Sequence, residues 1–119
     1  MAKKYFYQRY WGAFTDTERP IGFGYSGIAG NVMNNSSYER KPDEGPIPKG
    51  TYTISLTDNE KGQLTHHLEP DTTNKMYKRS GFMIHGDNAY ANHSASTGCI
   101  VAPYSTRFIF RVGDVIEVT

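Results

Sequence analysis

Residues 50–56 constrain the fold most, because β-branched and aromatic side chains follow one another in Gly-Thr-Tyr-Thr-Ile-Ser-Leu as they do in a β-strand. Residues 63–68 are predicted to pair with this strand after a turn at residues 59–62. Further strands are expected at residues 3–10, at residues 21–26 after the break at Pro20, and at residues 115–119. An apolar run at residues 80–85 ends on a histidine.

The aromatic and glycine content agrees with this pattern. Nine Tyr, six Phe and twelve Gly suit strands joined by tight turns better than packed helices. One short helix is predicted within residues 102–110, where Pro103 suits a first helical position and Phe108 and Phe110 are expected to reach the core. The sequence therefore predicts a mainly β domain with one or two short helices. A long loop, residues 27–48, is the kind that is often functional.

Length and charge narrow the class of protein. The 119 residues are predicted to form a single domain, 1–119. The formal net charge is +1 with acidic and basic residues interspersed, which argues against a nucleic-acid partner. No window approaches the roughly 18 apolar residues of a membrane span. The first residues lack the apolar segment of a secretory signal, so synthesis in the cytoplasm without Sec export is expected.

A histidine and the chain's one cysteine stand at positions that suit nucleophilic catalysis. His85 ends the apolar run, and Cys99 follows Ser-Thr-Gly fourteen positions later. A free thiol with a pKa near ~8.5 is mostly protonated at neutral pH, and a nearby imidazole can convert it to the reactive thiolate. A loop of this length can bring the two side chains together. We therefore predict Cys99 as nucleophile, His85 as base and a thiol pKa below the free value.

Other residues near the pair have two interpretations each. The amides of Gly98 and Cys99 are candidates for an oxyanion hole, because glycine lets a substrate carbonyl approach the backbone. Ser96 either bonds His85 or the substrate, or caps a turn. Asp87 either orients His85 or binds a substrate amine, or is a turn residue. Arg79 either grips a substrate carboxylate or is a solvated residue at a strand end.

The remaining histidines and the metal question complete the candidates. His93 is a rival base, and the adjacent His66 and His67 are expected to face opposite ways, one half-buried and one solvated. A lone cysteine forms no internal disulfide, and the alternative to a catalytic role is that it packs in the core as a small hydrophobic residue. No pair of residues shows a usual zinc spacing, so no metal and no cofactor are expected.

Four segments together resemble the Tlde1 family (formerly DUF2778), which is related to the L,D-transpeptidases. They are Tyr25-Ser26-Gly27, Gly45-Pro46-Ile47-Pro48-Lys49-Gly50-Thr51-Tyr52-Thr53-Ile54, Arg79-Ser80-Gly81-Phe82-Met83-Ile84-His85-Gly86-Asp87 and Ser94-Ala95-Ser96-Thr97-Gly98-Cys99-Ile100. The order of these segments is specific, whereas any one alone is weak. The broader L,D-transpeptidases commonly carry a histidine where Thr97 stands, so the resemblance assigns the base to His85.

The resemblance implies a small L,D-transpeptidase-like β-sheet or sandwich domain that acts on peptidoglycan. Its substrate would be the tetrapeptide stem, cleaved or exchanged at the bond between diaminopimelate and D-alanine. Cys99 and His85 would be catalytic, Gly98, Ser96 and Asp87 would support them, and Arg79, Tyr25 and Ser26 would bind substrate.

Family members include antibacterial effectors of type VI secretion. The resemblance therefore also implies action in the periplasm of a target cell, a cognate immunity protein and secretion-system components as partners. Two alternatives remain. One is a catalytically silent peptidoglycan-binding or phage-associated module with this fold, and the other is a toxin-like protein that mainly binds a partner.

Overall fold

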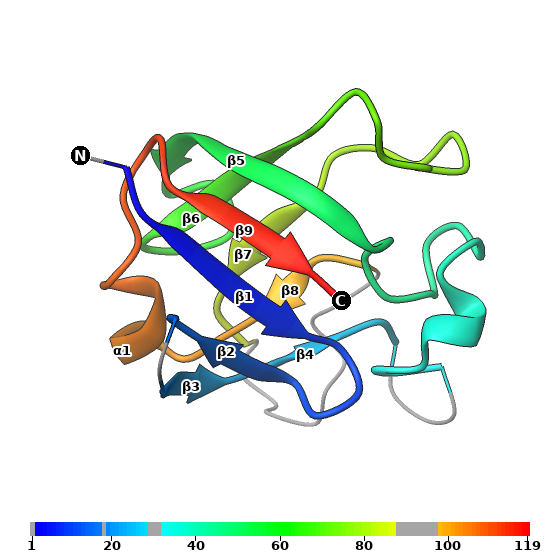
Figure 1. Cartoon of the computed structure of the whole chain (residues 1–119), viewed down its shortest axis with the longest axis horizontal. Helices are drawn as coiled ribbons and strands as arrows, with labels where there is room; N and C mark the ends of the chain where they lie inside the picture. The colour runs from blue at the N-terminus through cyan, green and yellow to red at the C-terminus, as the bar shows by residue number, and fades with distance from the viewer. Residues whose placement is uncertain (1, 18, 29–31, 88–97) are drawn as a thin grey trace.

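The structure, a computed structural model, describes residues 2–17, 19–28, 32–87 and 98–119. Among these residues, nine strands form one sheet in the order β3-β2-β1-β9-β5-β6-β7-β8-β4 (Figure 1). The elements in chain order are β1 (Lys4–Gln8), β2 (Ala13–Thr15), β3 (Pro20–Phe23), β4 (Tyr25–Ser26), η1 (Ser36–Tyr38), β5 (Gly50–Asp58), β6 (Thr65–Pro70), β7 (Met83–His85), β8 (Ile100–Val101), α1 (Tyr104–Arg107) and β9 (Val115–Val118). The prediction of a mainly β fold with one or two short helices is confirmed.

The sheet curls into a nearly closed barrel, because its two edge strands follow each other in the chain. β3 and β4 stand at opposite ends of the strand order, and only Gly24 separates them. The Gly24 amide donates to the Gly12 carbonyl at 2.7 Å, next to β2. On its other side, a Cβ added to Gly24 would lie 2.0 Å from the Val101 carbonyl oxygen in β8. A residue without a side chain thus lets the two ends of the sheet meet.

The central hairpin forms as the alternation of side chains predicts. β5 pairs antiparallel with β6 from Tyr52 opposite Pro70 to Asp58 opposite Thr65, with one bulge on the way. Tyr52 and Ile54 are fully buried, while Thr53 and Ser55 between and after them are exposed. This period of two places one face of β5 inside the barrel.

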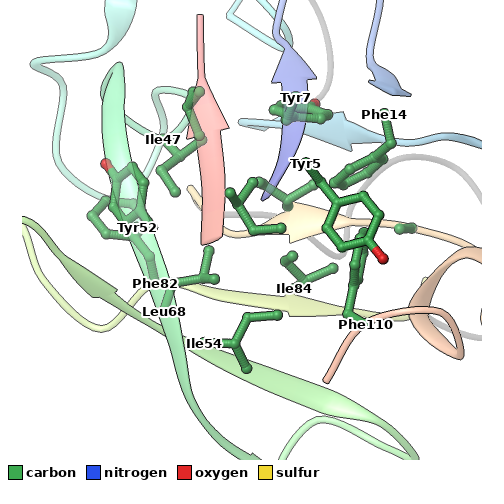
Figure 2. Close-up of a cluster of buried hydrophobic side chains, with 14 residues drawn as sticks. Tyr5, Tyr7, Phe14, Ile47, Tyr52, Ile54, Leu68, Phe82, Ile84 and Phe110 are labelled. Atoms are coloured by element: carbon green, nitrogen blue, oxygen red, sulfur yellow. The ribbon is translucent and has the colours of Figure 1, made fainter. Parts of the chain in front are cut away.

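Aromatic and branched side chains from most strands fill the barrel. Tyr5 and Tyr7 of β1 belong to this core (Figure 2). Ile116 and Val118 of β9, which pairs with β1 in parallel, belong to it as well. The remaining members of the core are Phe14, Ile47, Tyr52, Ile54, Leu68, Phe82, Ile84, Ile100, Ala102 and Phe110. Burial of this apolar surface is the main force that holds the short strands in one sheet.

Three local predictions are wrong. Residues 21–26 form two short strands rather than one, because the chain crosses from one sheet edge to the other at Gly24. The predicted strand at residues 3–10 ends at Gln8, and β2, which follows the turn, was not predicted. Phe110 lies in the core, but Phe108, which caps the C-terminal end of α1, is 56% exposed.

Within the residues described above, no helix has the length and apolar character to cross a membrane.

Candidate active site

The pairing of β7 with β8 places His85 and Cys99 on one face of the sheet. The two strands run parallel with Ile84 opposite Ile100 and His85 opposite Val101. Ile84 and Ile100 point into the core, so the alternate residues His85 and Cys99 point to the other face. Cys99 precedes Ile100 directly and is therefore a diagonal neighbour of His85. The two side chains thus stand on the same face of neighbouring strands.

Both side chains line the same pocket. Its volume is about 410 Å³, within the range of roughly 300–1,000 Å³ that is usual for ligand sites. The lining residues are Pro42, Asp43, Lys61, Lys78, Arg79, Ser80, Gly81, Phe82, Met83, His85, Gly98 and Cys99. A larger hollow of about 790 Å³ lies beside Arg9 and Tyr10, but its described lining includes no cysteine or histidine. The smaller pocket is therefore the candidate active site.

His85 is held in the tautomer that a general base requires. Its Nδ1–H donates to the Gly86 carbonyl at 2.8 Å, which leaves Nε2 as the proton acceptor. The residue is 5% exposed. Burial lowers the pKa of His85 below its ordinary value, and the positive charges of Lys61 and Arg107 contribute to the lowering. The imidazole is accordingly neutral at physiological pH.

The Cys99 sulfur is placed by the backbone around it. The thiol donates to the Gly81 carbonyl at 3.8 Å, and the Met83 amide donates to the sulfur. Burial raises the pKa of the Cys99 thiol, and the Met83 amide and Lys61 offset only part of that effect. The prediction of a lowered thiol pKa is wrong, because the surrounding chain removes water from the sulfur even though the side chain lines an open pocket.

At rest the pair is therefore a neutral thiol beside a neutral imidazole. Such a pair reacts by general-base catalysis, in which the imidazole takes the thiol proton as the sulfur attacks. A thiolate–imidazolium ion pair would require the opposite shifts, a lowered pKa for Cys99 and a raised pKa for His85.

Arg79 is a structural clamp. Its Nη1 donates to the carbonyls of Glu39 at 2.6 Å and Pro46 at 2.8 Å, and its Nη2 donates to the carbonyl of Gly45 at 2.9 Å. The guanidinium lies 5.0 Å from the ring centroid of Phe82. The interpretation of Arg79 as a solvated strand-end residue is wrong, since it is 9% exposed. Binding of a substrate carboxylate by Arg79 stays a prediction.

Gly98 packs against this clamp with a backbone that other residues rarely adopt. Its φ is +137°, and an added Cβ would lie 2.4 Å from Nη2 of Arg79. The close approach fixes the chain directly before Cys99. The oxyanion role of the Gly98 and Cys99 amides stays a prediction.

Tyr25 and Ser26 form β4, and Asp87 follows the end of β7. None of the three lines the pocket of His85 and Cys99, and Tyr25 and Asp87 line a different hollow of about 360 Å³. The Tyr25 hydroxyl donates to the Asp87 carboxylate at 2.8 Å, and Asp87 is exposed. The hydrogen bond from His85 Nδ1 goes to the Gly86 carbonyl, and an orienting role of Asp87 stays a prediction. Ser26 is 0% exposed and its hydroxyl donates to the Gly98 carbonyl. In this conformation the Ser26 side chain offers no surface to a substrate.

Sequence reasoning did not find the strained wall of the pocket. Asp43 and Lys78 line it with positive φ angles of 60° and 61°, and Tyr77 precedes Lys78 with a φ of 53°. Left-handed non-glycine residues cost about 1–3 kcal/mol each and gather at functional sites. Tyrosine and lysine carry no sequence signal for that backbone, and aspartate carries only a weak one. Lys61, whose charge acts on both His85 and Cys99, also has no motif around it.

A possible set of metal ligands lies outside the pocket lining. Asp58, Glu60 and His67 each offer one ligand atom, and these atoms lie within 4.8 Å of one another. His67 Nε2 is 3.0 Å from both Asp58 carboxylate oxygens.

His66, the neighbour of His67 in β6, faces the other way, as predicted. It is 1% exposed and bonded to Thr57 and the Arg107 carbonyl, so it is more deeply buried than expected.

Two predicted residues, Ser96 and the rival base His93, lie outside the described residues.

Comparisons with known proteins agree with the resemblance in sequence. A family model described as the Tlde1 domain matches residues 22–116, from the last two residues of β3 to the second residue of β9, and this range includes both His85 and Cys99. A search of curated proteins and a search of solved structures gave no significant match.

Proposed function

Because this chain belongs to the Tlde1 domain family, we propose that it is an effector enzyme that acts on bacterial peptidoglycan through Cys99. The reaction is acyl transfer at the bond between diaminopimelate and the terminal D-alanine of a tetrapeptide stem. The product depends on the acceptor, which is water in L,D-carboxypeptidase action and a D-amino acid or a second stem in L,D-transpeptidase action.

One observation carries the proposal. A cysteine and a histidine from neighbouring parallel strands line one pocket, and the histidine is held by Gly86 with Nε2 as proton acceptor. The nucleophile, the base and the group that orients the base are the three parts of a cysteine acyl-transfer site. Binding of peptidoglycan alone requires neither a nucleophile nor a base.

The sequence of bond changes follows from the resting charges. His85 Nε2 takes the proton from Cys99 while the sulfur bonds to the stem carbonyl carbon, and the negative charge moves to the carbonyl oxygen. The amides of Gly98 and Cys99 stabilise that oxygen. The C–N bond then breaks, the D-alanine nitrogen takes the proton from His85, and a thioester remains. The acceptor attacks the thioester with His85 again as base, and the thiol is restored.

The charges around the pocket support an anionic substrate. Lys61 and Lys78 are exposed on its lining, Asp43 is an acidic residue there, and Arg79 forms its inner wall. A tetrapeptide stem ends in a carboxylate and carries another on diaminopimelate. Two flexible ammonium groups at the rim suit such carboxylates as point charges.

The resemblance to type VI effectors also motivates a proposal for the biological setting. We propose that the protein acts in the periplasm of a target cell after delivery by type VI secretion, and that a cognate immunity protein protects the producing cell. The alternative, a catalytically silent module with this fold, lacks a reason for the paired Cys99 and His85.

The direct experiment is mass spectrometry of purified tetrapeptide muropeptides after incubation with the protein. Release of D-alanine, or its exchange for an added D-amino acid, is expected with the unsubstituted chain. Cys99→Ala is expected to keep the fold, because the side chain is only partly buried, and to lose both products. Thr53→Ala, an exposed change on β5, serves as the control. Wild-type release of D-alanine by Cys99→Ala would refute the assignment of the nucleophile.

A further inference from the structure

We propose that Ser26 is a positioning residue that aims the Cys99 amide at the reacting carbonyl oxygen. The inference rests on the proposed function, and it gives a catalytic task to a buried hydroxyl on β4. The Ser26 side chain makes two hydrogen bonds. The Ile47 amide donates to Oγ at 2.8 Å, and Oγ donates to the Gly98 carbonyl at 2.9 Å.

The direction of these bonds is fixed by chemistry. A backbone amide can only donate and a backbone carbonyl can only accept, so the hydroxyl proton must point to Gly98. Ser26 is 0% exposed, and in this conformation water does not compete for its hydroxyl. The hydroxyl is therefore held in one orientation by two groups that cannot exchange roles.

The position of Ser26 itself is also fixed. Ser26 pairs with Ile100 where β4 and β8 run antiparallel. Its amide donates to the Asn34 side chain at 2.9 Å, and its carbonyl accepts from the Asn34 amide at 2.7 Å. The hydroxyl thus stands on a rigid part of the sheet edge.

Holding the Gly98 carbonyl fixes the next amide. The described chain contains no cis peptide bond, so the Gly98 C=O and the Cys99 N–H lie on opposite sides of one planar peptide. With the carbonyl turned to Ser26, the Cys99 N–H points away from Ser26. Arg79 packs on the Gly98 α-carbon and limits rotation of the same segment. An amide set in this way needs no reorganisation when charge develops on a substrate oxygen.

The test compares two reactions of the same thiol. Alkylation by iodoacetamide displaces iodide and forms no oxyanion, whereas acylation by a p-nitrophenyl ester of an N-acetylated amino acid passes through one. For Ser26→Ala we expect alkylation within about twofold of wild type and acylation lower by about 10- to 100-fold. Outright loss of an oxyanion donor costs ~10²–10³. With muropeptides, kcat should fall while KM stays unchanged.

Two matched variants separate positioning from general disruption. Ser26→Thr keeps the hydroxyl and is expected to acylate faster than Ser26→Ala. Ser55→Ala removes an exposed hydroxyl that bonds the His67 carbonyl and is expected to behave as wild type in both reactions. Equal acylation of wild type and Ser26→Ala overturns the inference alone. An equal loss of acylation and alkylation in Ser26→Ala also overturns it, because the residue would then only support the fold. A wild-type protein that is alkylated but never acylated overturns the proposed function as well.

A measurement on the unsubstituted protein decides the matter if both Ser26 variants fail to fold. A peptide aldehyde adds the Cys99 sulfur to its carbonyl carbon, and its oxygen then takes the oxyanion position. The Cys99 amide proton is expected to move downfield in the NMR spectrum on this addition. An unchanged amide shift with the aldehyde bound overturns the inference.

Discussion

Replacing Arg79 by methionine is expected to destabilise the whole protein rather than only weaken substrate binding. The guanidinium donates to three backbone carbonyls of residues 39–46, and methionine can donate to none of them. Hydrogen bonds from a charged group contribute about 1.5–3 kcal/mol each. The pocket lets water reach part of the site, so the three losses do not add fully. We expect a loss of about 3–5 kcal/mol, which is less than the sum of three such hydrogen bonds.

Urea unfolding followed by circular dichroism measures this loss. With a slope of about 1.5 kcal/mol per molar urea, the midpoint should fall by roughly 2–3 M. Arg79→Lys keeps the charge but not the planar fork, and an intermediate loss of about 1–3 kcal/mol is expected. Arg19→Met is the control, because that side chain is 81% exposed, and a change within about 0.5 kcal/mol is expected.

An unfolding free energy of Arg79→Met within about 0.5 kcal/mol of wild type would refute the reasoning. If Arg79→Lys also kept full stability and raised only KM for the stem, Arg79 would be a substrate ligand instead of a clamp.

Further predictions concern the reacting pair. His85→Ala should lower turnover by ~10²–10⁴, with His93→Ala close to wild type, and steady-state rates showing the reverse ranking would move the base to His93. Turnover should be lost on acidification through a pKa below the ordinary ~6.5 of histidine, because protonated His85 cannot accept the thiol proton; a midpoint above that value would contradict the lowered pKa. Iodoacetamide should alkylate Cys99 more slowly than a free cysteine at pH 7, and faster alkylation would indicate a thiolate at rest. Dialysis against a strong chelator should leave turnover unchanged, since Asp58, Glu60 and His67 do not line the pocket, and a loss restored by zinc would contradict this.

The sequence predicted the parts of the fold that depend on local patterns. The hairpin of β5 and β6 follows from alternating side chains and a glycine turn, and both are visible in a short window. The meeting of the two sheet edges at Gly24 is not visible in a short window, because it depends on strands that are distant in the chain. β2 escaped prediction because three residues between two turns carry too little periodicity.

The same division holds in the candidate site. His85 and Cys99 were found because their residue types carry chemistry, and the structure places both in one pocket. Ser26 and Arg79 hold the backbone next to Cys99, but they do so by hydrogen bonds to backbone carbonyls, which every residue has. The type of a residue does not predict that its carbonyl will accept a hydrogen bond from Arg79 or from Ser26. The two residues that the proposed reaction uses could therefore be selected from the sequence, and the backbone contacts that hold them could not.

The direction of the Cys99 pKa shift shows what the frame adds to the chemistry. A backbone amide and nearby positive charges favour the thiolate. Desolvation favours the neutral thiol, and here it outweighs the Met83 amide and the charges of Lys61 and Arg79. A neutral thiol is a poor target for oxidants and stray electrophiles, so it stays intact until a substrate carbonyl is in place. Proton transfer to His85 then occurs in the attack itself, and stabilisation of the developing oxyanion becomes the step that the protein must prepare. In the proposed reaction, that requirement gives the Ser26 hydroxyl and the Arg79 clamp their importance, because both contact Gly98, whose peptide carries the amide that we propose as oxyanion donor.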